Sequence, residues 1–307
     1  MRKFFTFTIF LIALGVGTYT QRVEVLEWYR GVTTPELPES IRYEDRFPIK
    51  DDREDPLFHL DPLDEGTEDS DEEIDGSDEI YPTDTPEPSE PEEQLAEEEP
   101  IEEPPVDEPV EEESTLPVSM NLAVPFTSQA PHGNWDEPYQ EGCEEASVYM
   151  VHAYFSGMDE GRIPASTADE AILQVVEFEM ELFGFYKDTT AEKTGVFAEL
   201  LYGHTYQLLT NPTVEDIQRK LVQGHPVIVP VAGRLLGNPY FTAPGPLYHM
   251  LVIRGYTEEG QFIVNDPGTY RGEAYLYDFD TIMNALHDWN EGGEITDGGK
   301  VVLVLSP

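Results

Sequence analysis

Apolar residues recur three and four positions apart in four stretches of the second half of the chain, which is the spacing of one helix face. The first predicted helix begins at Cys143 and is ended by Gly157, and the others cover residues 167–183, 193–203 and 213–223. We expect Ser166 or Thr167 to cap the second helix. Thr213, followed three residues later by Asp216, resembles a capping box at the start of the fourth.

After Gly224 the helical period gives way to short β-rich runs. These runs cover residues 226–231, 250–256, 261–265, 273–277 and 301–305, and residues 278–289 look helical again. Glu258, Glu259 and Gly260 connect two of the runs, as in a hairpin with a left-handed glycine. Helices first and a mostly antiparallel sheet second predict an α+β fold, in contrast to the alternation of a doubly wound fold.

Charge separates a folded part of the chain from a spacer. The formal net charge is −46, and acidic residues and prolines dominate residues 51–115, where Arg53 is the one basic residue. Such a segment buries too little apolar surface to offset its conformational entropy. We therefore predict a disordered stalk, extended by proline and by charge repulsion. Residues 116–307 are long enough for one compact domain.

The start of the chain has the pattern of an export signal. Arg2 and Lys3 precede an apolar run at residues 4–16. This run is shorter than the about 20 residues of a transmembrane helix, and both a cleaved signal and an uncleaved anchor stay open. We expect an extracytoplasmic domain, secreted or membrane-anchored through this segment alone. The predicted division is a signal or anchor at 1–20, a polar and partly helical segment at 21–50, the acidic spacer at 51–115 and the folded domain at 116–307.

Composition also limits the partners and cofactors. A strongly acidic chain without a basic stripe argues against nucleic acid as a partner. The acidic run lacks the spaced Asp and Asn and the central Gly of a calcium loop. Cys143 is the one cysteine, which excludes a disulfide within the chain and a four-cysteine zinc site. We expect no cofactor and no metal.

Three polar residues stand in local settings that suit nucleophilic catalysis. Cys143 begins a predicted helix, where the helix dipole favours the thiolate. His249 begins a predicted strand, and Asp266 ends the next one. If these strands pair as a hairpin, the imidazole and the carboxylate meet at one end of the sheet, where the carboxylate can orient the ring. Each residue alone is more often structural. Such a cysteine is usually a small buried side chain, such a histidine usually a polar residue with its hydrogen bonds made, and Asp before Pro-Gly usually a turn former.

Two stretches resemble a known family. VPFTSQAPHGNWDEPYQEGCEEASVYM and YHMLVIRGYTEEGQFIVNDPG are similar to stand-alone peptidases related to the double-glycine, bacteriocin-processing peptidases. That group has a papain-like fold, so the resemblance implies a helical half packed on a mostly antiparallel sheet. It also implies that Cys143 is the nucleophile and that His249 and Asp266 complete the triad. A Gln before the cysteine would supply an oxyanion donor, with Gln129 as first choice and Gln140 as second.

One departure from the family concerns the residues after the cysteine. The family commonly has glycine there, whereas Glu144 and Glu145 follow Cys143 in this chain. Two carboxylates near a thiol oppose its ionisation. In the first turn of a helix, however, they also interact favourably with the dipole.

The sequence therefore predicts an exported cysteine peptidase that hydrolyses peptide or amide bonds through a thioester intermediate. Its partner would be a peptide or protein substrate, with cell-wall peptide as one candidate. Trp135, Tyr139 and Tyr248 would flank the cleft, and residues 232–247 would form a lid. Two alternatives stay open: a weak or inactive surface-displayed module that binds peptide, and an amidase or transglutaminase-like acyl transferase.

Overall fold

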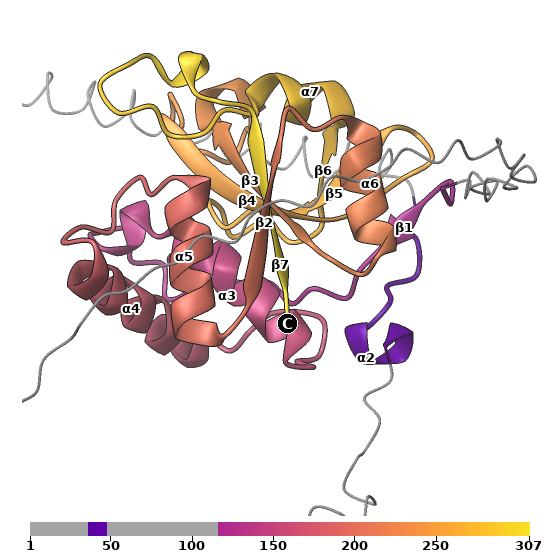
Figure 1. Cartoon of the computed structure of the whole chain (residues 1–307), viewed down its shortest axis with the longest axis horizontal. Helices are drawn as coiled ribbons and strands as arrows, with labels where there is room; N and C mark the ends of the chain where they lie inside the picture. The colour runs from indigo at the N-terminus through magenta and orange to yellow at the C-terminus, as the bar shows by residue number, and fades with distance from the viewer. Residues whose placement is uncertain (1–35, 48–115) are drawn as a thin grey trace, which may run out of the picture. The chain divides into compact units, whose positions relative to one another are not determined.

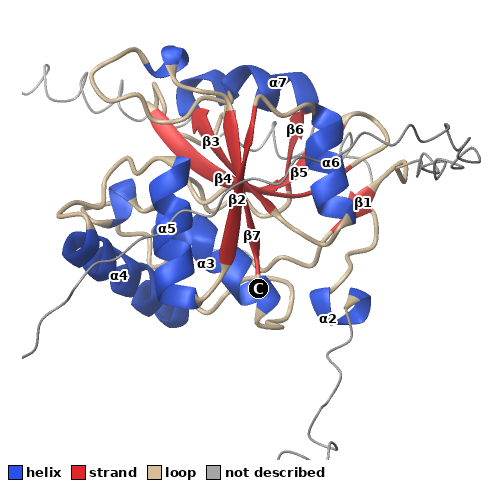
Figure 2. Cartoon of the chain, in the orientation of Figure 1, coloured by secondary structure: helices blue, strands red, loops and turns tan. Residues whose placement is uncertain are grey.

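The helices and strands occupy different parts of the domain, as the α+β prediction requires (Figures 1 and 2). The computed structural model describes residues 36–47 and 116–307. The predicted export signal and the acidic spacer lie outside the described residues. Within the described residues, no helix is both long enough and apolar enough to cross a membrane.

Three helices, α3, α4 and α5, lie together on one side of the domain, away from α6 and α7 (Figure 2). The helices are α2 (Tyr43–Arg46), α3 (Cys143–Phe155), α4 (Ala165–Leu182), α5 (Ala191–Tyr202), α6 (Val214–Val222) and α7 (Phe279–Ala285). Short 3-10 turns are η2 (Tyr139–Glu141), η3 (Gly233–Leu236) and η4 (Ile295–Asp297).

The strands form one sheet in the order β2-β7-β3-β4-β5-β6, and β1 pairs with β4 off this path. Every pairing is antiparallel. The strands are β1 (Met120–Asn121), β2 (Thr205–Thr210), β3 (Val227–Ala232), β4 (Tyr248–Tyr256), β5 (Gln261–Asn265), β6 (Tyr275–Asp278) and β7 (Val301–Ser306). The predicted α+β fold with a mostly antiparallel sheet is confirmed.

Several caps and turns predicted from the sequence are present in the structure. The side chain of Thr213 accepts from Asp216 N and the Asp216 carboxylate accepts from Thr213 N, so the predicted capping box is present. Gly260 adopts the left-handed conformation that the β4–β5 hairpin requires. The predicted cap of α4 was wrong, because this helix begins earlier, at Ala165, and its N-cap residue Pro164 has no side-chain hydrogen bond. Helix α7 ends at Ala285, four residues short of the predicted end.

The core lies where α3 packs against β4. All nine residues of β4 are buried, and in α3 all except His152 and Phe155 are buried. A strand buried on both faces has a continuous apolar sequence, as MLVI in β4 shows. This contact brings the start of α3 and the start of β4 into the same region, and both ends carry candidate site residues.

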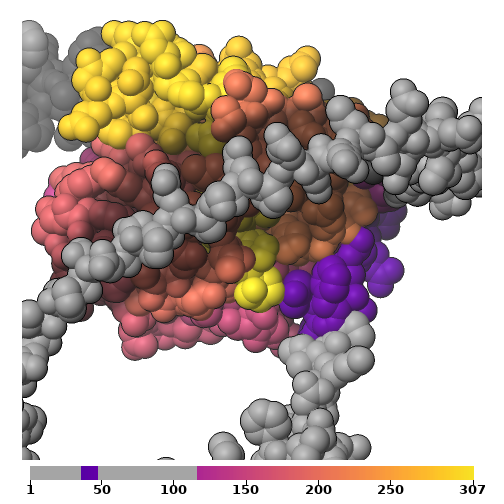
Figure 3. Space-filling view, in the orientation of Figure 1, coloured from indigo at the N-terminus to yellow at the C-terminus, as the bar shows by residue number. Residues whose placement is uncertain are grey.

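Residues 36–47 pack on the domain. Ile41 N donates to Asn121 O at 3.0 Å, and Ala123 N donates to Ile41 O at 2.9 Å. The ring of Tyr43 stands edge-on to Phe155, with centroids 5.1 Å apart. Figure 3 shows this segment in indigo lying directly against the surface of the domain. Residues that we expected in a separate polar segment therefore contribute to the folded unit.

Two buried acids, Glu145 on α3 and Glu179 on α4, face each other between these helices. Each is 0% exposed, and in the part of the chain that the structure describes none of their carboxyl oxygens has a hydrogen-bond partner. Burial raises the pKa of Glu145 well above its usual value, and the charge of Glu179 raises it further. Burial and the nearby Glu144 raise the pKa of Glu179 to about 9. We infer that both acids are protonated at neutral pH, because ionising either would leave an unpaired buried charge.

This pair predicts that stability falls as the pH rises. The folded pKa lies above the unfolded one, so the contribution to stability is fully present below about pH 4.5 and is lost as the pH rises to about 9, because the unfolded chain releases the proton first. Over that window each proton changes the free energy of unfolding by at most about 1.4 kcal/mol per pH unit. Glu179→Gln should match the wild type in denaturant melts at about pH 5 and exceed it at about pH 8. The exposed Glu181→Gln should keep the wild-type pH slope. Equal slopes for all three proteins would contradict the account.

Candidate active site

Cys143 is the first residue of α3 and is 6% exposed. Gly142 precedes it and lies against Gln129, so that a Cβ built on this glycine would be 3.7 Å from the Gln129 Cβ. At the start of a helix the first N–H groups have no partner within the helix and carry the positive end of its dipole. The predicted position of the cysteine at a helix N-terminus is therefore confirmed.

The thiol of Cys143 contacts Glu144. Its Sγ donates to Glu144 Oε2 at 3.0 Å. Burial raises the pKa of Cys143 well above the usual value, and the negative charge of Glu144 raises it further, whereas the nearby backbone N–H of Met250 on β4 lowers it. Because Met250 follows His249, the sulfur lies near the strand that carries the candidate base.

His249 and Asp266 form a buried pair, as the hairpin register predicted. His249 Nε2 lies 2.7 Å from Asp266 Oδ1, and the two side chains are 2% and 0% exposed. Val252 pairs with Asn265 across β4 and β5, which brings the start of β4 and the end of β5 to the same edge. Gly268 N donates to the same carboxylate oxygen at 3.0 Å.

Two residues that sequence analysis missed hold the other oxygen of Asp266. The Tyr277 hydroxyl donates to Asp266 Oδ2 at 2.7 Å, and Asn238 Nδ2 donates to it at 3.1 Å. Asn238 Nδ2 also lies 2.7 Å from the Tyr277 hydroxyl. Burial alone would raise the pKa of Asp266, but His249, Tyr277 and the Gly268 N–H outweigh it, and this pKa lies below the usual value. Asp266 is therefore a carboxylate with a full set of partners.

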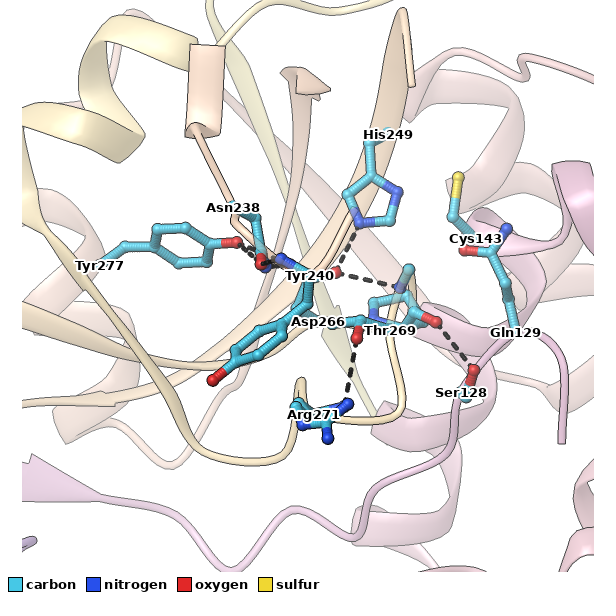
Figure 4. Close-up of polar contacts among 12 residues, drawn as sticks. Ser128, Gln129, Cys143, Asn238, Tyr240, His249, Asp266, Thr269, Arg271 and Tyr277 are labelled. Atoms are coloured by element: carbon cyan, nitrogen blue, oxygen red, sulfur yellow. Dashed lines mark hydrogen bonds and ion pairs between the residues drawn. The ribbon is translucent and has the colours of Figure 1, made fainter. Parts of the chain in front are cut away.

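The second ring nitrogen of His249, Nδ1, faces the side of the site where Cys143 lies (Figure 4). Since Nε2 is held by Asp266, Nδ1 is the nitrogen left for the thiol. Among the described residues the thiol's hydrogen bond is to Glu144, and no hydrogen bond joins it to the imidazole. The structure thus pairs His249 with Asp266 and places Cys143 near them. The thiol itself is hydrogen-bonded to Glu144.

The two glutamines occupy different environments. Gln129 is buried, and its Nε2 donates to Tyr139 O at 3.0 Å and to Gln140 O at 2.9 Å. Both amide protons therefore brace the turn before Cys143, and Gln129 Oε1 is left without a partner in the described part of the chain. The side chain of Gln140 is exposed and donates to Glu141. Of the two, Gln129 is the one that lies beside the cysteine (Figure 4).

The loop after η3 covers the imidazole. Phe241 stands edge-on to His249 with ring centroids 5.5 Å apart. Gly268 allows this close approach, because a Cβ there would lie 2.9 Å from both the Phe241 and the His249 rings. A pocket of about 490 Å³ lies within the same loop and is lined by Arg234, Asn238 and Phe241 among others. Its walls thus include residues that contact Asp266 and His249.

The aromatic residues expected to flank a cleft have separate roles. Trp135 is 39% exposed. Tyr139 is half-buried and its hydroxyl donates to Asp169 at 2.6 Å. Tyr248 is buried, and its hydroxyl donates to Thr189 O and Asp288. Of the three, only Trp135 presents a largely open ring surface.

The described residues contain no group of three or more His, Cys, Asp and Glu side chains arranged to hold a metal ion. The groups that the site itself brings together are a thiol, an imidazole, a carboxylate and backbone N–H groups. Such a set supports acyl transfer through a covalent thioester.

Removing the Tyr277 hydroxyl should weaken the hold on Asp266. In Tyr277→Phe one charge-assisted donor to this buried carboxylate is lost, so the free energy of unfolding should fall by about 1.5–3 kcal/mol. Denaturation in urea measures this. Tyr256→Phe is a matched control, because that buried hydroxyl donates to the neutral Pro117 carbonyl, away from the site, and its loss should cost about 1 kcal/mol. A Tyr277→Phe protein no less stable than Tyr256→Phe would contradict the account.

Comparison with known proteins shows which family the chain resembles in sequence. No curated protein matches the chain. Among solved structures, a putative C39-like peptidase from Bacillus anthracis is similar, with a TM-score of 0.41 and 15% sequence identity over 62% of this chain and 98% of that chain. The Peptidase_C39 like family matches residues 121–296, which is more than half of the chain and contains every candidate site residue. The chain belongs to the Peptidase_C39 like family.

Proposed function

We propose that the chain is an exported cysteine peptidase that hydrolyses peptide or amide bonds, with Cys143 as nucleophile, His249 as base and Asp266 as the orienting carboxylate. The observation that carries this proposal is the 2.7 Å contact between His249 and Asp266, next to the helix N-terminus that presents the one cysteine of the chain. Membership of a peptidase-like family supports the same reaction class.

In the first half of the reaction, the Cys143 thiol passes its proton to His249 Nδ1, and the sulfur attacks the carbonyl carbon of the substrate. Asp266 stabilises the imidazolium that forms and keeps Nε2 protonated. The imidazolium then gives its proton to the leaving amine, and the C–N bond breaks. A thioester between Cys143 and the acyl part of the substrate remains.

In the second half, water replaces the amine. His249 takes a proton from the water, whose oxygen attacks the thioester carbon, and the imidazolium returns a proton to the departing sulfur. The products are a carboxylic acid and the regenerated thiol. An added amine in place of water would give the acyl-transferase alternative from the same intermediate.

The negative oxygen formed in each half requires donors. The backbone N–H of Cys143, at the start of α3, is one. We assign the second to Gln129, which lies beside the cysteine. Because its Nε2 now donates to two backbone carbonyls, it would have to exchange one of these bonds for the oxyanion. A role as a brace for the turn that precedes Cys143 is the competing assignment.

One observation favours a second candidate function, a module that binds peptide without hydrolysis. The thiol is buried and bonded to Glu144, and its pKa is raised, all of which oppose a reactive thiolate. Both functions share the peptide partner, and we propose cell-wall peptide as one candidate substrate. Placement outside the cytoplasm rests on the sequence pattern of residues 1–20 alone.

Replacing the sulfur tests the two functions directly. Cys143→Ala should lower the cleavage of a peptide library to background while leaving the fold intact, because alanine is small and suits a helix start. Liquid chromatography with mass spectrometry of the digest measures the loss. His249→Ala should reduce cleavage to the same level, since the two residues act as a unit. Peptide cleavage that survives in Cys143→Ala would rule out the assignment, and binding without cleavage in the wild type would favour the second function.

The loop around Phe241 should control access to the site. Phe241→Ala removes the ring that covers His249, so a small alkylating reagent should reach Cys143 faster, by about threefold to tenfold. The rate of labelling by iodoacetamide measures this, and the single cysteine makes the readout specific. Phe262→Ala, which changes a buried ring on β5, controls for general loosening of the core. Equal labelling of Phe241→Ala and the wild type would contradict the lid.

A further inference from the structure

Glu144 is placed at the reacting sulfur by two contacts with different oxygens. Its Oε1 accepts the backbone N–H of Thr189 at 3.1 Å, and its Oε2 lies 3.0 Å from Cys143 Sγ. An oxygen that accepts an N–H is the carbonyl-like oxygen of the carboxyl group. The proton of the neutral acid is therefore on Oε2, a hydroxyl oxygen that still accepts the S–H while the thiol is intact.

The surroundings of Glu144 contain acids and neutral groups. It is 1% exposed, and it forms no ion pair with any Lys or Arg in the described ranges 36–47 and 116–307. The titratable groups that face it are Cys143 and Glu145 on α3, Glu179 on α4, Asp188 before α5 and Tyr248 on β4. Burial raises the pKa of Glu144, and the charge of Glu145 raises it further. The hydrogen bonds that Glu144 accepts favour its carboxylate form, but burial and the neighbouring acids outweigh them, and no cation in this set offsets them.

We propose that Glu144 is a catalytic residue that works in its protonated form, its O–H donating to the Cys143 thiolate. This inference deepens the proposed function and rests on it. Once the thiol proton has moved to His249 Nδ1, the sulfur is negative and no longer donates to Oε2, so the Glu144 O–H turns to donate to the sulfur. Glu144 keeps its proton throughout, so no proton is gained or lost. A carboxylic acid that is kept neutral by its surroundings can act as a hydrogen-bond donor in this way.

The proposal reverses the usual effect of an acid beside a thiol. An ionised Glu144 would repel the thiolate and hold the thiol proton away from His249. A protonated Glu144 stabilises the thiolate by a short hydrogen bond. The two states therefore predict opposite results when Glu144 is replaced by glutamine, which keeps the oxygen for Thr189 and presents an N–H to the sulfur.

The test measures alkylation of Cys143 by iodoacetamide as a function of pH. Glu144→Gln should react within about threefold of the wild type at pH 7 and outpace it as the pH rises, since glutamine cannot ionise. Glu144→Met, similar in length but without a donor, should react at least about tenfold more slowly at pH 7. Glu177→Gln, which changes an exposed acid on α4, should follow the wild-type profile. A Glu144→Gln protein that reacts tenfold or more faster at pH 7, or a Glu144→Met protein as fast as the wild type, would overturn the proposal.

A second measurement does not depend on reactivity or on Glu144→Met folding. Infrared difference spectra between the wild type and Glu144→Gln at pH 7 should show the carbonyl stretch of a protonated carboxylic acid in the wild type. A carboxylate band in its place would overturn the proposal. If the acid band is present but the wild type cleaves no peptide, and Cys143 reacts no faster than a small free thiol, then the proposed function fails while the protonation of Glu144 stands.

Discussion

The pairing of β4 with β5 is the constraint on which the site depends. His249 and Asp266 meet because Val252 is opposite Asn265, and a slip of one residue would turn the His249 side chain to the other face of the sheet. A slip would move every β4 side chain to the opposite face of the sheet. Since all nine residues of β4 are buried, their packing opposes it. The same strand packs against α3, so one buried element fixes the base, its carboxylate and the position of the nucleophile. Tyr277 lies on β6, which pairs with β5, and its hydroxyl donates to the second carboxylate oxygen of Asp266.

The helical half supplies an unusual electrostatic setting. Glu144, Glu145 and Glu179 are buried with no cation to pair with them among the described residues. The large negative charge of the chain comes mainly from residues 51–115, so it does not explain these three acids. A buried carboxylate with no cation beside it is costly as an anion, so the neutral acid is the lower-energy form. A nucleophile in this setting gains from the helix dipole and from hydrogen bonds, and it loses if any of the three acids ionises.

Much of this architecture was predictable because local signals agree with the fold. The apolar spacing after Cys143, the Thr213–Asp216 capping box and the hairpin at Gly260 each have a direct counterpart in the structure. Strand β2 was missed because it is an edge strand whose residues are at most half-buried, which leaves no strong apolar alternation. The start of α4 was misplaced because the helix begins directly after Pro164, which stands at the N-cap although it has no side-chain oxygen for a cap.

The site was only partly readable from the sequence. His249 and Asp266 could be paired from strand register, but Asn238 comes from a loop and Tyr277 from another strand, and such long-range contacts leave no local signal. Glu144 was expected as a helix-start acid, and only the contact of α3 with its neighbours shows that it is buried against the sulfur.

The most direct test of the account is a crystal structure of the protein after reaction with a peptide aldehyde, which forms a reversible adduct with an active thiol. The account predicts a bond between Cys143 Sγ and the aldehyde carbon, with His249 Nδ1 within hydrogen-bond distance of the adduct and Nε2 still on Asp266. An unmodified thiol that remains on Glu144 at saturating aldehyde, with the imidazole turned away, would contradict it.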